Sequence, residues 1–274
     1  MNKMVLDKNW QMQIIGENVY GISEDWLEAE VPGSVYGNLL KQGLMPDPFD
    51  RMNELDALRL MENDFRFRTT FQISKQQIDS DFLLLHFDGI DTLAKVYLNG
   101  RLLAKVDNMH RIWEFNIAET AVCGENTLLL EFASPTKYIE EENAKVFTGG
   151  SHEAMKGFPH LRKAHCMFGW DWGPRLPDAG IFREVSVLSG KKARLEQVYI
   201  TQNWRNGKTG ISGEESGNKQ EDGNNSESKW TEEVDIIFDG SIEHYVSEDH
   251  YEIKIALYDD KGDLIESKSS KEGA

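Results

Sequence analysis

Two tryptophans that flank one acid are the residues of this chain best suited to chemistry, in the stretch CMFGWDWGP at positions 166–174. Trp170 and Trp172 each offer a broad apolar face and one N–H donor, which suits the C–H face of a pyranose ring. The carboxylate of Asp171 accepts paired hydrogen bonds from neighbouring hydroxyls. These residue types therefore favour carbohydrate binding.

The setting of the two indoles matters, because tryptophans belong to a core more often than to a binding surface. Successive side chains of an extended stretch point in opposite directions, so one indole can anchor in the core while Asp171 and the other indole reach outward. Gly169, Gly173, Pro174 and Pro177 indicate a shaped loop, and loops on rigid scaffolds commonly carry function. The alternative is a loop that only packs between domains.

Other catalytic or metal-binding arrangements are not predicted. His152, His160, His165 and Cys166 crowd one segment, but their spacing matches no short chelating motif. The glycines at 149–150 lack the strand-turn-helix setting of a phosphate-binding loop. No Gly-x-Ser-x-Gly motif or convincing nucleophilic triad is present. We expect no metal and no cofactor.

The elements that must position the WDW stretch are short alternating or apolar runs broken by turn residues, which predict antiparallel strands. In FRFRTTFQI (65–73) the apolar residues alternate with Arg66 and Arg68. Residues 93–106 predict a hairpin, because Asn99-Gly100 tolerates the positive φ angles of a type I′ turn. Further strands are predicted at 81–90, 112–117, 126–133 and 182–190. Only 34–43 and 138–146 resemble helices, so the first domain, residues 1–190, is predicted to be an all-β sandwich.

A second domain is predicted at 191–274. Its alternating runs at 194–204, 232–243 and 251–262, followed by DLIESK, give three or four strands, fewer than the seven or so of an immunoglobulin-type sandwich. An incomplete sandwich is the prediction. Residues from about 205 to 229 contain a single large apolar side chain and are predicted to form a flexible loop.

Composition limits the class of partner. The 274 residues carry a formal net charge of −17, which argues against binding to nucleic acid or to an anionic membrane. No apolar run is long enough to span a membrane, and the start lacks the apolar run of a signal peptide, so we expect a cytoplasmic protein. Cys123 and Cys166 are then expected to be free and buried.

Five blocks of this sequence resemble the amino-terminal part of the β-mannosidases of glycoside hydrolase family 2. The similarity extends from about residue 7 to residue 200, and the FGWDWGP motif indicates the mannosidase branch. The blocks are VPGSVYGNLLKQGLMPDPFDRMNE (31–54), NDFRFRTTF (63–71), FDGIDTLAKVYLNG (87–100), DNMHR (107–111) and LRKAHCMFGWDWGPRLPDAGIFREV (161–185).

The resemblance implies a jelly-roll, galactose-binding-like sandwich followed by an immunoglobulin-like sandwich and a catalytic barrel, and the barrel is absent from this chain. Such enzymes hydrolyse terminal, non-reducing β-D-mannose residues with two glutamates of the barrel. No residue here corresponds to either, so no catalytic residue is predicted, and we expect the chain alone to be inactive. Its expected partners are a β-mannoside and the missing barrel.

The resemblance also implies that the WDW loop lines the pocket for the terminal mannose. Asp171 matches a sugar-contacting acid, Trp170 matches an indole of the pocket wall, and Arg162 and Trp172 would orient Asp171 or pack behind it. Two alternatives stay open: a free-standing carbohydrate-binding module, and another family 2 glycosidase such as a β-galactosidase or β-glucuronidase.

Overall fold

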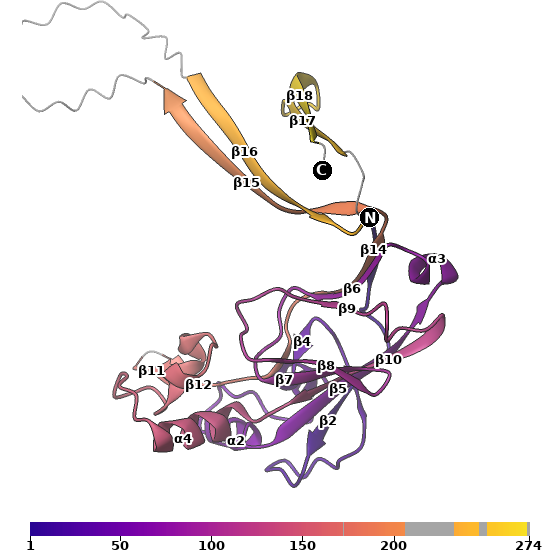
Figure 1. Cartoon of the computed structure of the whole chain (residues 1–274). Helices are drawn as coiled ribbons and strands as arrows, with labels where there is room; N and C mark the ends of the chain where they lie inside the picture. Colours follow the sequence, from indigo (N-terminus) through magenta and orange to yellow (C-terminus); the bar gives the residue numbers. More distant parts are fainter. Residues whose placement is uncertain (172, 206–232, 247–250, 273–274) are drawn as a thin grey trace, which may run out of the picture. The chain divides into compact units, whose positions relative to one another are not determined.

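The computed structural model describes residues 1–171, 173–205, 233–246 and 251–272, and the chain divides into two compact units, Met1–Lys191 and Lys192–Ala274 (Figure 1). The division lies next to the predicted domain boundary at Gly190. The predicted flexible loop of about 205–229 falls, from residue 206 onward, outside the described residues.

The first unit is a jelly-roll sandwich of two antiparallel sheets, which confirms the predicted all-β class. A four-stranded sheet has the order β1 (Asn2–Val5), β14 (Val185–Gly190), β6 (Phe82–Phe87) and β9 (Trp113–Asn116). A six-stranded sheet has the order β3 (Leu27–Ala29), β2 (Trp10–Ile15), β5 (Asp64–Ile73), β10 (Gly124–Phe132), β7 (Ala94–Leu98) and β8 (Arg101–Val106). Two-residue strands β4 (Gly33–Ser34) and β13 (Gly180–Ile181) pair separately.

Strand alternation places one large core between the sheets. Phe65, Phe67 and Phe71 of β5 are buried, whereas Arg66 and Arg68 lie on the solvent side, as predicted. The same core holds side chains from β6 and β14 of the other sheet. Burying one such aromatic side chain contributes about 1.5–3 kcal/mol to the free energy of folding. The core that these side chains form supports the surface loops.

The turn between β7 and β8 has the predicted type I′ conformation. Asn99 and Gly100 have φ values of 50° and 79°. The side-chain amide of Asn99 donates to the carbonyl oxygen of Thr120 at 3.0 Å and to Oδ1 of Asn126 at 2.8 Å. This hairpin is therefore fixed both by its own turn and by its place in the six-stranded sheet.

The helices include two that the sequence did not predict. Expected were α1 (Val35–Lys41), capped by Ser34, and α4 (Pro135–Lys145), capped by Ser134. Unpredicted are α2 (Asn53–Leu60) and the one-turn α3 (Lys75–Ile78), because each is short and α2 buries only Ala57 and Leu60. Single 3-10 turns, η1 (Phe158–His160) and η2 (His165–Met167), precede the WDW stretch.

The expectation of buried cysteines is wrong. Cys123 and Cys166 are free but exposed. Cys123 lies in the connection before β10 and Cys166 lies in η2, and both are surface segments rather than strand interiors. The apolar character of a thiol does not by itself place it in a core.

The second unit contains two antiparallel hairpins in its described part. β15 (Ala193–Arg205) pairs with β16 (Glu233–His244), and β17 (Tyr251–Tyr258) pairs with β18 (Leu264–Glu272). These strands coincide with the predicted runs, while the immunoglobulin-like assignment stays a prediction. Across the described residues, no helix is long and apolar enough to cross a lipid bilayer.

Candidate functional site

The residues on either side of Trp172 form a hairpin of their own. β11 (Phe168–Trp170) pairs with β12 (Gly173–Arg175), with Phe168 opposite Arg175 and Trp170 opposite Gly173. These two strands belong to neither main sheet, and Figure 1 shows them beside α4. The hairpin is therefore positioned by contacts with loops and helices rather than by a sheet ladder.

The tip of this hairpin presents the predicted ligand-binding side chains to solvent. Asp171 is exposed, and the indole of Trp170 is 45% exposed. No side chain or backbone group of the described residues is hydrogen bonded to the Asp171 carboxylate, so its oxygens are open to an incoming hydroxyl. Trp172 lies outside the described residues.

A small apolar cluster holds the hairpin from below. Phe168 of β11 is fully buried and packs with Ile139 of α4 and with Leu161. Its carbonyl oxygen accepts a hydrogen bond from the backbone N–H of Met155 at 3.0 Å. Four partly buried side chains complete this cluster, which we call the hairpin cluster: Leu93, Tyr138, Met155 and Phe158.

Gly169 and Arg175 make the hairpin compact. Gly169 has φ +87°, and a Cβ atom at this position would lie 2.6 Å from Cγ of Arg175, so only glycine fits. Arg175 donates from Nη2 to the carbonyl oxygen of Glu153 at 3.0 Å. Its backbone N–H donates to Oε1 of Glu54 at 2.9 Å, which joins β12 to α2.

A buried lysine fixes the segment that leads into the hairpin. The Lys163 ammonium has no exposed surface, forms an ion pair with Asp91, and donates to the carbonyl oxygen of Asp178 at 2.6 Å. Asp91 in turn exchanges backbone hydrogen bonds of 2.9 and 2.8 Å with Gly180. Burial lowers the pKa of Lys163, and the negative charge of Asp91 opposes that shift.

Asp178 is a second polar group of this anchor. One carboxylate oxygen accepts from the backbone N–H groups of Tyr36 at 3.1 Å and Ala179 at 2.8 Å. Burial raises the pKa of Asp178 to about 6, although these hydrogen bonds favour the charged form. The base of the hairpin therefore contains a group that titrates close to neutral pH.

Arg162 forms no hydrogen bond or ion pair with Asp171 within the described part of the chain. Its side chain is exposed, and its carbonyl oxygen accepts from the backbone N–H of Met109 at 3.0 Å. The predicted role of Arg162 in orienting Asp171 stays a prediction, as does that of Trp172.

The histidines near the hairpin make structural contacts. Nε2 of His160 is hydrogen bonded to the carbonyl oxygen of Val146 at 2.8 Å, and the ring of His165 lies edge-on to Phe158, with centroids 4.8 Å apart. Among the residues that the structure describes, no group of His, Cys, Asp and Glu is arranged to hold a metal ion.

Sequence reasoning missed the residues that hold the hairpin in place. Lys163, Arg175 and Glu54 contact partners 15 to 121 residues away, and no local pattern marks such contacts. The one available signal was indirect: Lys163 and Asp91 each lie within a block of the family resemblance.

Comparison with known proteins identifies relatives of the first unit. The family model described as "Glycosyl hydrolase 2 galactose-binding domain-like" matches residues 10–183. Beta-mannosidase of Mus musculus is 32% identical over 200 residues, which cover 66% of this chain and 22% of that protein. Beta-mannosidase B of Emericella nidulans is 33% identical over 201 residues, which cover 70% of this chain and 23% of that protein. The chain thus spans about a fifth of the length of these curated relatives.

A solved structure agrees with the sequence relatives. The crystal structure of beta-D-mannosidase from Dictyoglomus thermophilum matches with a TM-score of 0.78 and 30% identity, covering 100% of this chain and 30% of that chain. The exo-beta-D-glucosaminidase CsxA matches with a TM-score of 0.60 at 15% identity, which is a similarity of fold alone.

Proposed function

This chain belongs to the glycosyl hydrolase 2 galactose-binding domain-like family, and from that membership we propose that it is the amino-terminal, non-catalytic part of a β-mannosidase. In this proposal a separate catalytic barrel hydrolyses terminal, non-reducing β-D-mannosides. The chain supplies one wall of the mannose pocket. The proposed location is the cytoplasm.

The observation that carries the proposal is the exposed tip of the β11–β12 hairpin. Asp171 and Trp170 lie in the open on a stiffly supported turn. A carboxylate that has no hydrogen-bond partner among the described residues is suited to accept hydroxyl hydrogen bonds, and the adjacent indole is suited to cover a C–H face. The similarity to proteins named beta-mannosidase supports a mannoside as the ligand.

The chain's mechanistic role would be placement rather than bond cleavage. A retaining glycosidase needs two carboxyl groups about 5–5.5 Å apart, one as nucleophile and one as acid and base. We assign neither to this chain. Hydrogen bonds donated by hydroxyls of the terminal sugar to the Asp171 carboxylate would hold the sugar ring at the depth that the nucleophile requires, so that binding energy serves orientation.

A chimera tests this role. The matching region of the Dictyoglomus thermophilum enzyme is replaced by this chain, and hydrolysis of an aryl β-D-mannoside is measured for the parent chimera, Asp171→Asn and Asp171→Ala. We expect kcat/KM to fall by about 10²-fold or more in both variants, since misplacing a substrate near the reacting centre costs that much. The melting temperature should stay unchanged, because the side chain is exposed.

Asp7→Ala is the control, since Asp7 is also exposed but lies outside the hairpin. Full activity of Asp171→Ala would contradict the proposal. Hydrolysis by the isolated chain would contradict its non-catalytic assignment. Assay of the chimera against aryl β-galactosides and β-glucuronides distinguishes the other family 2 activities.

A further inference from the structure

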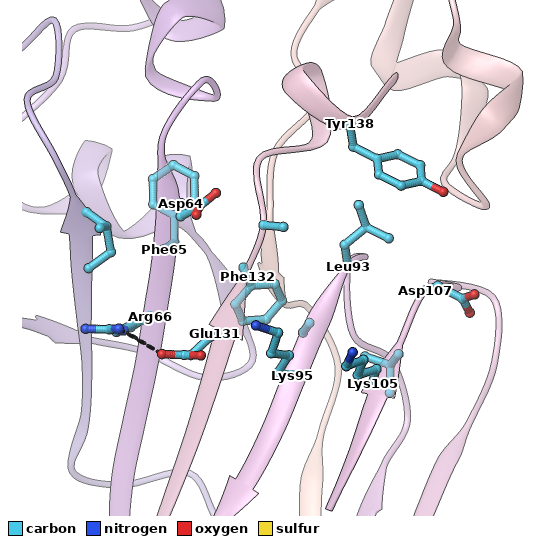
Figure 2. A pocket seen from close by; sticks show the side chains of 14 residues that line it. Asp64, Phe65, Arg66, Leu93, Lys95, Lys105, Asp107, Glu131, Phe132 and Tyr138 are labelled. Carbon is cyan, nitrogen blue, oxygen red and sulfur yellow. Dashed lines mark hydrogen bonds and ion pairs between the residues drawn. The ribbon is translucent and has the colours of Figure 1, made fainter. Parts of the chain in front are cut away.

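A pocket of about 430 Å³ is lined by residues from several strands of the six-stranded sheet (Figure 2). It lies where β5, β7, β8 and β10 approach α4. Its volume is within the range of roughly 300–1,000 Å³ that small-molecule sites occupy. Among the described residues, none of those assigned above to mannoside binding lines it.

One end of the pocket is apolar. Figure 2 shows the ring of Tyr138 beside the side chain of Leu93, at the top of the strands. Both side chains are partly buried, and Phe132 lines the pocket below them. A phenol ring at a pocket edge offers a flat apolar surface and a polar tip, which suits a ring with one C–H face and hydroxyl edges.

The floor of the pocket carries both positively and negatively charged side chains. Arg66 is already paired with Glu131, at 2.8 Å from Nη2 to Oε1, and this pair appears as a dashed line in Figure 2. Lys95 and Lys105 are exposed and lie opposite each other in the register of β7 and β8. Within the described part of the chain, neither lysine forms an ion pair.

Two unpaired lysines directly opposite each other repel, which costs a sheet stability. Asp107 also lines the pocket, and its exposed carboxylate has no ion-pair partner among the described residues. Lys95 also lies opposite Glu131 in the register of β7 and β10. The pocket therefore presents ammonium donors and a carboxylate acceptor without ion pairs of their own beside an apolar wall.

We propose that this pocket is a second carbohydrate-binding site, which takes a short neutral oligosaccharide. Tyr138 and Leu93 would contact the C–H face of one sugar ring. Lys95 and Lys105 would donate to its ring and hydroxyl oxygens, and Asp107 would accept from a hydroxyl.

The charge balance favours a neutral ligand over an anionic one. Three basic side chains line the pocket, namely Arg66, Lys95 and Lys105. Three acidic side chains also line it, namely Asp64, Glu131 and Asp107. The pocket is thus neutral within a chain of net charge −17, whose overall field disfavours anions. A neutral saccharide uses both kinds of group without that penalty.

Calorimetric titration and saturation-transfer NMR of the full 274-residue chain test the proposal, with β-1,4-mannotriose as the neutral probe and trigalacturonate as the anionic probe. We expect mannotriose to bind and trigalacturonate to bind more weakly. The double variant Lys95→Gln/Lys105→Gln should weaken mannotriose binding by about tenfold or more, since it removes two charged donors. Both lysines are exposed, so the variant should fold normally.

Four further variants make the result specific. Tyr138→Ala should abolish binding, and Tyr138→Phe, which keeps the ring, should retain it. Lys8→Gln, at an exposed lysine outside the pocket, should change nothing. Trp170→Ala should leave the affinity within about twofold, because Trp170 does not line this pocket.

Each contrary result overturns the second site. The absence of mannotriose binding would do so, as would preference for trigalacturonate. Binding that Trp170→Ala removes and Lys95→Gln/Lys105→Gln leaves intact would place the sugar at the hairpin, which refutes this inference while supporting the proposed function. Activity of the chimera with Asp171 intact is independent of the outcome.

Discussion

Two hairpins of the first unit are built by opposite means. The β7–β8 hairpin turns at Asn99-Gly100 and lies at the edge of the six-stranded sheet, so its neighbours in the sheet fix it. The β11–β12 hairpin has strands of only three residues and belongs to neither main sheet. Its position depends on Phe168 below it, and on Arg175 and Lys163 beside it.

The difference separates the scaffold from the candidate site. A hairpin within a sheet shares its backbone hydrogen bonds with many residues, so the removal of one side chain changes its position little. A hairpin held by a few side chains presents its tip away from the sheets, where a ligand can reach it, and each of those side chains becomes critical. The exposed indole of Trp170 and the carboxylate of Asp171 thus lie on a hairpin that only a few side chains hold in place.

The largest expected effect comes from removing the buried anchor. Lys163→Met leaves Asp91 charged and unpaired in the interior, which typically costs about 3–5 kcal/mol. Urea denaturation of the first unit should show this decrease. The exposed Lys105→Met, on the β7–β8 hairpin, should lie within about 0.5 kcal/mol of the wild type.

A rescue sharpens that result. Replacing both partners, in Lys163→Met/Asp91→Leu, removes the unpaired charge and should recover most of the stability. A single variant as stable as the wild type would show that the ion pair does not hold the hairpin base.

Two glycine-to-alanine variants, one in each hairpin, form a matched pair with smaller expected losses of stability. Gly169→Ala combines a left-handed backbone with a Cβ 2.6 Å from Arg175, so a cost of about 1–3 kcal/mol is expected. Gly100→Ala has a similar φ of +79° but no atom within 4 Å of the new Cβ, so only about 1–2 kcal/mol is expected. In the chimera, Gly169→Ala should also reduce mannosidase activity, whereas Gly100→Ala should not. Equal effects of the two variants on activity would remove the distinction between the hairpins.

A pH dependence is expected at the hairpin base. Because the folded pKa of Asp178, about 6, lies above the ordinary value of 3.8, the folded chain holds this proton between pH 4 and 6 after the unfolded chain has released it. The contribution of Asp178 to stability therefore falls as the pH rises through that window and remains lower above it. Asp178→Asn cannot ionise.

Melting temperatures of Asp178→Asn and wild type, measured from pH 4 to pH 7, test this sign. The melting temperature of the variant minus that of the wild type should increase by a few degrees as the pH rises. A difference that stays constant would show that Asp178 ionises alike in both states.

The sequence predicted the sheets better than the supports of the site. The alternation in 65–73 and the Asn99-Gly100 turn are local signals, and both appear in the structure as expected. The exposed position of Asp171 followed from chain-breaking residues around it. Glu54 and Arg175 are 121 residues apart, so their contact depends on the finished fold and leaves no local trace. The helix α2 was missed because its apolar positions are too few.

The lengths of β15 and β16, 13 and 12 residues, bear on solubility. In the described part of the chain each pairs only with the other, so each leaves an open edge, and apolar side chains such as Leu195 and Ile200 are exposed. Long open edges template aggregation. Residues 230–274 carry 13 acidic groups against 4 lysines, and this like-charge repulsion keeps two copies apart, so acid or high salt should favour precipitation of this chain.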